Sequence, residues 1–338
     1  GHTMARSELT GPTLNRLSPR VFSTGLWLWS IYGALTLIQF VVLATAGNIF
    51  VISDMGIFDA LNISLTTMPS GGFGPRDSGI MHYNSAIVEG IIILFMFLAG
   101  VNFTLLHLGF VRRKFKKATS DQEFRTYAIL LLVATLLMSI NLLRSTTNSF
   151  SWSIRHAAFQ AVSIGTSTGF SSANFSAWPG LSTSILLILM IVGASAGSTG
   201  GGVKVLRLRI LGKLALREVS QMGEPHRVMP IKEDKKILSP DSVNTMLGML
   251  GVWVFSFIGG IIIIGMLETT ISFESLISIV ASSLGNTGPA LDAFGPTSTW
   301  TSLTPGGLII TSLLMWMGRL ELLTVMVVIR LRTWKKIN

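Results

Sequence analysis

Six long, nearly uncharged apolar stretches are the feature of this sequence that most restricts its fold. They lie at about residues 24–46, 84–111, 126–143, 180–196, 244–267 and 306–329. A helix rises 1.5 Å per residue, so about 20 apolar residues cross a hydrocarbon core roughly 30 Å thick. Only 12% of the residues are charged, against about a quarter in ordinary soluble domains. The sequence therefore predicts an all-α membrane protein.

The fourth stretch is the shortest of the six and runs directly into glycines. Residues 197–202 contain Gly197, Gly200, Gly201 and Gly202. Each glycine inside a helix costs about 1 kcal/mol relative to alanine, so the helix is expected to stop before the far interface. We expect residues 197–202 to form a flexible loop inside the membrane.

The formal net charge is +10, and the placement of the cationic residues explains it. Of the 26 Lys and Arg residues, 22 lie before the first stretch, in the connections 112–125 and 204–236, or after the last stretch. By the positive-inside rule, these connections and both termini are expected to be cytoplasmic. Orientation alone accounts for the charge, so no nucleic-acid partner is expected. The basic run 112–117 also suits contact with anionic lipid or a cytoplasmic partner.

The connections on the opposite side each contain a shorter apolar stretch, near 55–68, 152–166 and 273–285. Thirteen to fifteen residues make a helix of roughly 20–22 Å, too short to cross. Each is therefore interpreted as a re-entrant half-helix that enters the membrane from outside. Ser53 and Asp54 are placed to cap the first half-helix. Arg155 and His156, near the start of the second, are expected at the outer interface.

Span, half-helix, extended return segment and span form a unit that occurs three times. The predicted organisation is a cytoplasmic segment 1–23, units 24–111, 126–218 and 244–338, and cytoplasmic linkers 112–125 and 219–243. In every unit the half-helix leads into a glycine-containing segment: Thr66–Phe73, Ser163–Phe170 and Ser282–Pro289. Three such coincidences of position indicate a shared role.

We expect that role to be the binding of a dehydrated cation. The partially negative C-terminal end of each half-helix points at the middle of the membrane. Gly72, Gly169 and Gly288 can adopt positive φ at little cost, so neighbouring carbonyl groups can turn together and replace the hydration shell of an ion. The alternative is that these glycines let helices pack closely. The candidate ion-binding residues are Ser70, Gly71, Gly72, Ser167, Thr168, Gly169, Asn286, Thr287 and Gly288.

Three runs carry a resemblance to a known family: Thr168-Gly169-Phe170, Ala194 to Lys204, and Met317-Gly318-Arg319-Leu320-Glu321. Over nearly its whole length the chain resembles the membrane subunit of the Trk/Ktr/HKT superfamily of potassium transporters. The resemblance implies a pseudo-fourfold, cation-channel-like pore of four units, of which this chain has three that resemble the second, third and fourth. Because the chain opens with Gly1 and His2 rather than an initiator Met, we expect a piece that lacks the first unit and does not conduct alone.

The resemblance also implies an intramembrane gate beneath the filter, a homodimer in the lipid bilayer and a TrkA-like cytoplasmic ring that binds nucleotide. Arg319 lies 13 residues into the last stretch, roughly 20 Å deep, where an unpartnered cation costs from about 3 to more than 10 kcal/mol. We expect Arg319 to pair with carbonyl groups of residues 197–202 and to form an electrostatic barrier at the gate. The alternative is a structural ion pair with Glu321 or Glu89.

The leading prediction is transport of potassium, or of potassium and sodium, across the cell membrane. Ion transport involves no covalent chemistry, so no enzyme activity and no covalent cofactor are expected. The chain has no cysteine, which excludes a disulfide framework, a thiolate metal site and a cysteine nucleophile, and its five histidines lack the spacing of metal ligands. Residues 197–204 resemble a phosphate-binding loop only superficially, because Val203 separates the last glycine from Lys204. Two alternatives stay open: an ion-coupled transporter of a small solute, with Glu89 and Glu321 as its buried acids, and a non-transporting membrane scaffold.

Overall fold

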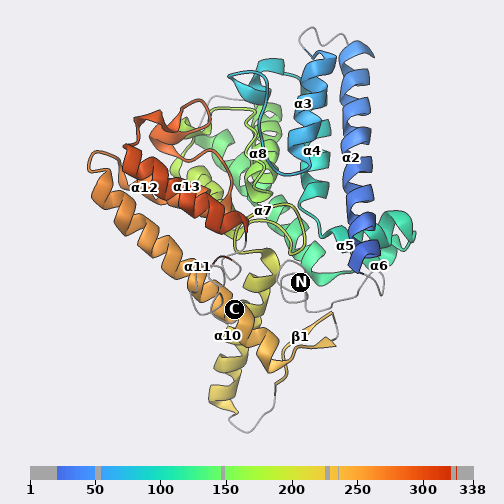
Figure 1. Ribbon diagram of the computed structural model, residues 1–338, viewed down its shortest axis with the longest axis vertical. Helices are drawn as coiled ribbons and strands as arrows, with labels where there is room; N and C mark the ends of the chain where they lie inside the picture. The colour runs from blue at the N-terminus through green and yellow to red at the C-terminus, as the bar shows by residue number, and fades with distance from the viewer. Residues whose placement is uncertain are drawn as a thin grey trace, which may run out of the picture.

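The computed structural model describes residues 21–49, 55–145, 149–224, 229–234, 236–320 and Val325. Within these residues the chain is almost entirely helical (Figure 1). Its strands, as far as the description extends, form one short hairpin of β1 (Lys232–Glu233) and β2 (Lys236–Ile237). The predicted all-α fold is confirmed.

Among the described residues, three helices are long and apolar enough to cross a membrane: α2 (Val21–Ile49), α7 (Gln122–Ser145) and α11 (Pro240–Leu267). Each exposes large apolar side chains. Leu37, Leu132 and Phe255 are 61%, 58% and 78% exposed. Apolar surface of this extent is stable against lipid and costly in water.

The second predicted span, 84–111, is not one continuous helix. Its residues form α4 (Ala86–Ala99), α5 (Phe103–Leu106) and the π-helical turn η2 (His107–Val111), and the direction changes by 104° after α4. Gly100 stands at the break, where a Cβ atom would lie 2.3 Å from the Tyr127 hydroxyl. The side chain of Asn102 accepts the N–H of Thr104 at 2.8 Å and starts the next helix. This glycine and this cap explain why the second predicted span is bent.

The fourth predicted span, 180–196, is also shorter than predicted, and the sixth is described only in part. Helix α9 (Gly180–Val192) ends at Gly193, whose φ is +69°. Helix α13 (Pro305–Arg319) ends beside Leu320, and of the predicted remainder only Val325 is described. Glu321 therefore lies outside the described residues.

All three predicted half-helices are present as α3 (Ile57–Thr67), α8 (Phe150–Gly165) and α12 (Phe273–Gly285). Ser149 and Ser272 cap α8 and α12 by accepting backbone N–H groups, whereas Ser53 and Asp54 lie outside the described residues. Each half-helix packs between the helices of its own unit, α2 with α4, α7 with α9, and α11 with α13 (Figure 1). The return segments contain the short helices η1 (Gly79–Tyr83), η3 (Phe175–Ala177), η4 (Asp292–Phe294) and η5 (Trp300–Ser302).

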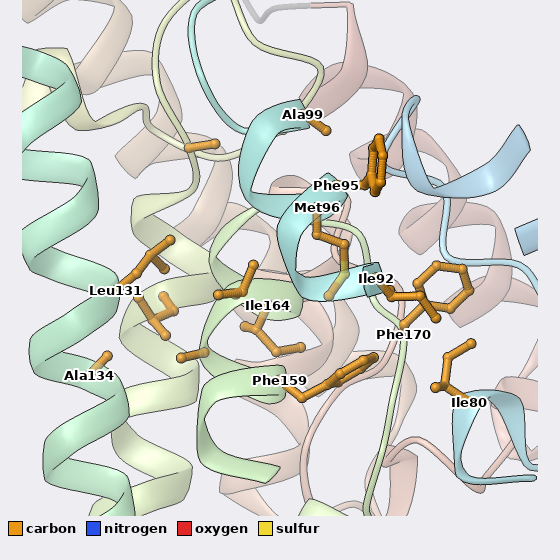
Figure 2. Packing of buried hydrophobic residues seen from close by; sticks show 14 of the residues in the cluster. Ile80, Ile92, Phe95, Met96, Ala99, Leu131, Ala134, Phe159, Ile164 and Phe170 are labelled. Carbon is orange, nitrogen blue, oxygen red and sulfur yellow. The ribbon is translucent and has the colours of Figure 1, made fainter. Parts of the chain in front are cut away.

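The largest hydrophobic core lies where α8 meets α4 and α7 (Figure 2). Met96 of α4, Phe159 and Ile164 of α8, and Phe170 of the following segment are fully or almost fully buried there. A smaller core forms between α11, α12 and α13. The half-helices are thus fixed by packing on several sides, which holds their C-terminal ends in place.

The basic connections contain ordered elements. Helix α6 (Phe115–Thr119) lies in the first, and α10 (Val205–Gly223) with the β1–β2 hairpin forms the second, at the bottom of Figure 1. Glu233 of the hairpin is buried and accepts hydrogen bonds from Arg209 and Lys213 of α10. The hairpin is therefore fastened to α10 by charge.

Candidate ion pathway and gate

Each half-helix is followed by a short turn with the same unusual backbone. We call residues 70–72, 167–169 and 286–288 the re-entrant loops. Their first residues, Ser70, Ser167 and Asn286, have φ of +57°, +58° and +53°. Their third residues, Gly72, Gly169 and Gly288, have φ of +66°, +83° and +98°. Positive φ at a residue other than glycine is uncommon, so its repetition at one position makes the three loops structurally equivalent.

The hydrogen bonds of the loops repeat in the same way. The carbonyl of Thr66 accepts the N–H groups of Gly71 and Gly72 at 2.8 and 3.3 Å. The carbonyl of Ser163 accepts those of Thr168 and Gly169 at 2.9 and 3.4 Å, and the carbonyl of Ser282 accepts that of Thr287 at 3.0 Å. Because the half-helix ends use these N–H groups, the carbonyl groups are the main polar groups that the loops have left for another partner.

The loops also lie edge to edge. A Cβ atom built on Gly72 would lie 1.8 Å from the carbonyl oxygen of Thr168, and one built on Gly169 would lie 2.1 Å from that of Thr287. Both distances are far below van der Waals contact, so only glycine fits. A Cβ atom built on Gly288 would meet no described atom within 4 Å. The structure thus brings together the first loop with the second, and the second with the third.

The segment between α9 and α10, residues 193–204, is here called the glycine-rich loop. It packs against the half-helix ends. A Cβ atom on Gly200 would lie 2.8 Å from the Thr166 carbonyl oxygen, and one on Gly201 would lie 2.1 Å from that of Gly285. The loop also bonds to two re-entrant loops: the hydroxyls of Ser70 and Thr199 are 2.8 Å apart, and Gly201 N–H donates to Ser167 Oγ at 3.1 Å.

The other two predicted gate glycines, Gly197 and Gly202, determine the backbone conformation of this loop. Gly197 has φ of +70° and its carbonyl accepts the N–H of Phe103 at 3.1 Å, directly after the break in the second span. Gly202 has φ of +81° and passes so close to Gly193 that a Cβ atom would lie 2.8 Å from its Cα. The loop is thereby joined to α5 and folded back on its own start.

Arg319 reaches this region from the end of α13. Its Nη1 donates to the carbonyl of Thr199 at 2.9 Å and its Nη2 to that of Pro69 at 3.1 Å. The guanidinium therefore connects the glycine-rich loop to the end of the first half-helix. The alternative partner Glu89 is engaged elsewhere, since both of its carboxylate oxygens accept hydrogen bonds from Arg155 at 2.7 Å.

Three polar residues near this region are held by contacts within the protein. Arg155 pairs with the buried Glu89, and His156 is buried with its Nδ1 2.9 Å from Ser172 Oγ; their position at the outer interface stays a prediction. Lys204, at the start of a predicted cytoplasmic connection, is buried and its Nζ donates to the carbonyl of Gly200. Counting charges assigns a lysine only to a connecting segment, whereas its long, flexible side chain can direct the ammonium group into the protein.

Sequence reasoning also missed Glu123. Its carboxylate accepts the N–H of Ala196 at 2.5 Å, so the first turn of α7 holds the glycine-rich loop. Nothing local in the sequence signals this long-range contact. Lys204, in contrast, could have been identified from the sequence, because it ends the run Ala194 to Lys204. In the described part of the chain, no three His, Asp or Glu side chains gather as a metal site.

The fold and these loops define a membrane pore protein built from repeated half-helix units. The chain belongs to the TrkH family, whose model, described as a cation transport protein, matches residues 2–335. It is a transport family and not a family of enzymes.

The chain is 32% identical over 338 residues to the Trk system potassium uptake protein TrkH of Halomonas elongata, across 99% of this chain and 68% of the relative. It is 30% identical over 341 residues to TrkH of Escherichia coli strain K12, with the same coverage. The crystal structure of the potassium transporter TrkH from Vibrio parahaemolyticus is similar with a TM-score of 0.85 and 29% identity, over 98% of this chain and 69% of that chain.

Proposed function

We propose that this protein carries potassium ions across the cell membrane along a pathway lined by carbonyl groups of the re-entrant loops. The observation that supports this most is that the three loops share one backbone geometry and lie edge to edge. Each follows the C-terminal end of a half-helix, whose partial negative charge favours a cation. Relatives named as potassium uptake proteins support potassium as the ion.

In this proposal the glycine-rich loop and Arg319 are the gate. The close approach of Gly201 to the carbonyl of Gly285 leaves little space between this loop and the half-helix ends. Arg319 places a fixed positive charge beside the carbonyls of Thr199 and Pro69, where it opposes a passing cation. An ion passes only when the loop moves and the guanidinium leaves these carbonyls.

The wider setting belongs to the same proposal. Both termini and the basic connections face the cytoplasm, because 22 of the 26 cationic residues lie on that side. The three pore units keep the bounds given above. The protein assembles as a homodimer and answers to a TrkA-like nucleotide-binding ring, as the resemblance to its superfamily implies.

The structure disfavours a solute transporter that uses Glu89 as its coupling acid. Glu89 is buried and bonded through both oxygens to Arg155. Removing either member of such a buried pair leaves an uncompensated charge, so this pair is better explained as a structural link between α4 and α8.

Rubidium uptake into liposomes by the full-length protein tests the proposal. The wild type is expected to take up rubidium, with competition by potassium stronger than by sodium. Arg319→Ala is expected to raise uptake about tenfold or more, because two hydrogen bonds from a charged group hold the loop. Arg319→Lys keeps the charge but loses the planar fork, so its uptake should be intermediate.

Arg217→Ala is the matched control, since Arg217 pairs with the exposed Glu218 on α10 and touches neither loop. Its uptake should equal that of the wild type. Unchanged uptake by Arg319→Ala would remove Arg319 from the gate. Absence of uptake by every variant would instead favour the non-transporting scaffold.

A further inference from the structure

We propose that the hydroxyl groups of Ser70 and Ser167 are latches that hold the glycine-rich loop closed, so that the ion-binding loops themselves position the gate. This inference rests on the proposed function. The two serines are the first residues of equivalent re-entrant loops. Their side chains bond to the glycine-rich loop two residues apart, at Thr199 and Gly201.

Burial makes these two contacts significant. Ser70 is 5% exposed and Ser167 is 1% exposed. A buried hydroxyl or N–H that loses its partner has little water to replace it. The N–H of Gly201 has no carbonyl partner among the described backbone contacts, so Ser167 Oγ satisfies it. Moving the glycine-rich loop away breaks both contacts.

The third re-entrant loop differs at this position. Asn286 stands where Ser70 and Ser167 stand, and its side-chain Nδ2 has no hydrogen-bond partner within the described residues. Instead the amide lies against α13: a Cβ atom built on Gly318 would be 2.5 Å from Asn286 Nδ2. Gly318 precedes Arg319, which itself bonds to the glycine-rich loop at Thr199. Each re-entrant loop thus meets the gate, two by a serine latch and the third through the helix that carries Arg319.

This arrangement has a mechanical consequence. Ser70 and Ser167 hold a left-handed backbone conformation with φ of +57° and +58°, which for a residue other than glycine stores strain. The same residues carry the latch on the side chain and a candidate ion-binding carbonyl on the backbone. Opening of the glycine-rich loop therefore releases the residues that shape the ion pathway, and the two events are coupled.

Four variants of the full-length protein in liposomes test the latch: Ser70→Ala, Ser167→Ala, Thr199→Val and Thr199→Ser. Loss of one hydrogen bond should raise rubidium uptake about two- to tenfold. Ser70→Ala combined with Thr199→Val should match Thr199→Val alone, because Thr199→Val already removes the bond to Ser70, together with the 3.2 Å bond from Thr199 Oγ1 to the Ala99 carbonyl. Ser70→Ala combined with Ser167→Ala should multiply the single effects. Thr199→Ser retains the hydroxyl, so its uptake should lie below that of Thr199→Val.

Ser139→Ala is the matched control for a buried serine. Its hydroxyl is also buried but bonds only to the carbonyl of Thr135 in its own helix, at 2.7 Å. Uptake by this variant should equal that of the wild type. Thr199→Ser and Thr199→Val, which differ in the hydroxyl, separate a lost latch from a damaged fold.

A second readout follows the loop itself. The sequence contains no cysteine, so Ser198→Cys introduces the single thiol of these 338 residues into the glycine-rich loop. Maleimide labelling of this thiol should accelerate by the same two- to tenfold factor in the Ser70→Ala and Ser167→Ala backgrounds. Unchanged uptake or unchanged labelling in both backgrounds overturns the latch. If that occurs while Arg319→Ala still raises uptake, the proposed function stands; if no protein takes up rubidium, the proposed function itself fails.

Discussion

Single atoms decide the geometry of the re-entrant loops. Gly169 has a positive φ and faces the carbonyl of Thr287, and Gly72 faces that of Thr168 in the same way. A methyl group at either position would overlap a backbone carbonyl group of the neighbouring loop, and backbone cannot move aside as a flexible side chain can. Glycine is therefore required here for space as well as for conformation.

Gly169→Ala should abolish rubidium uptake and lower the free energy of unfolding by about 1–3 kcal/mol. The added Cβ would lie 2.1 Å from the Thr287 carbonyl oxygen, so the second and third loops must separate. Gly33→Ala is the control, because a Cβ on Gly33 of α2 meets nothing within 4 Å; it should retain uptake and gain up to about 1 kcal/mol. Thermal melting in detergent and liposome uptake measure the two effects. Equal behaviour of both variants would contradict the close approach.

At the scale of elements, the β1–β2 hairpin is held by charged groups that respond to pH. Asp121 precedes α7, and Asp234 in the hairpin accepts the N–H of Gln122 at 3.1 Å. Burial, together with the neighbouring Asp234 carboxylate, raises the pKa of Asp121 to about 6. The Phe124 N–H opposes this rise by donating to Asp121 at 3.0 Å. The folded state thus binds a proton that the unfolded chain releases at lower pH.

The hairpin should therefore loosen as pH rises through about 6, because ionised Asp121 then repels Asp234. Its stabilising contribution is complete below the ordinary pKa of an aspartate, about 3.9, and is lost above the raised value. Hydrogen exchange of amides 229–238 between pH 5 and pH 7.5, corrected for intrinsic rates, measures the effect. Asp121→Asn should reduce this dependence of protection on pH. Protection that increased with pH would contradict the pairing.

The sequence predicted the helices better than their breaks. The half-helices were found because their length and position follow from apolar runs of 13 to 15 residues, and hydrophobicity is a local property. The bend after Ala99 was missed, although Gly100 and Asn102 were visible as a break and a cap, because apolar content continues through it. The positions of the loop glycines were predicted from their register after each half-helix.

What the sequence could not supply were contacts between distant segments. Glu123 with Ala196, and Ser70 with Thr199, join residues that are 73 and 129 positions apart. Such pairs depend on how whole units pack, and no local pattern encodes them. The contact of Arg319 with a carbonyl of the glycine-rich loop was expected from the cost of an isolated charge in the membrane, which is a physical constraint rather than a pattern.

At the scale of the whole molecule, successive units touch through their return segments as well as through their loops. The N–H of Met81 donates to the carbonyl of Ser171 at 3.2 Å, which joins the first unit to the second. A Cβ atom built on Gly295 would lie 3.1 Å from Ser176 Cβ, which places the third unit against the second. The units are therefore arranged in chain order.

Paired cysteines test this order. Ser176→Cys with Gly295→Cys should form a disulfide under mild oxidation, since disulfide Cβ atoms lie about 3.5–4.5 Å apart and a small adjustment suffices. Ser176→Cys with Gly74→Cys is the control, because a Cβ on Gly74 meets nothing within 4 Å. Proteolysis between the two positions followed by non-reducing electrophoresis detects the link. Failure of the first pair to cross-link, or cross-linking of the control pair, would contradict the arrangement.

The edge-to-edge packing of the re-entrant loops also constrains how this sequence can evolve. A backbone carbonyl group of one loop packs against a glycine of its neighbour: that of Thr168 against Gly72, and that of Thr287 against Gly169. A mutation that shifts the backbone of one re-entrant loop therefore also displaces the neighbouring loop. Drift in one repeat must then be accompanied by compensating drift in the adjacent repeat, so the internal copies are free to diverge in side chains while their main-chain paths stay locked together.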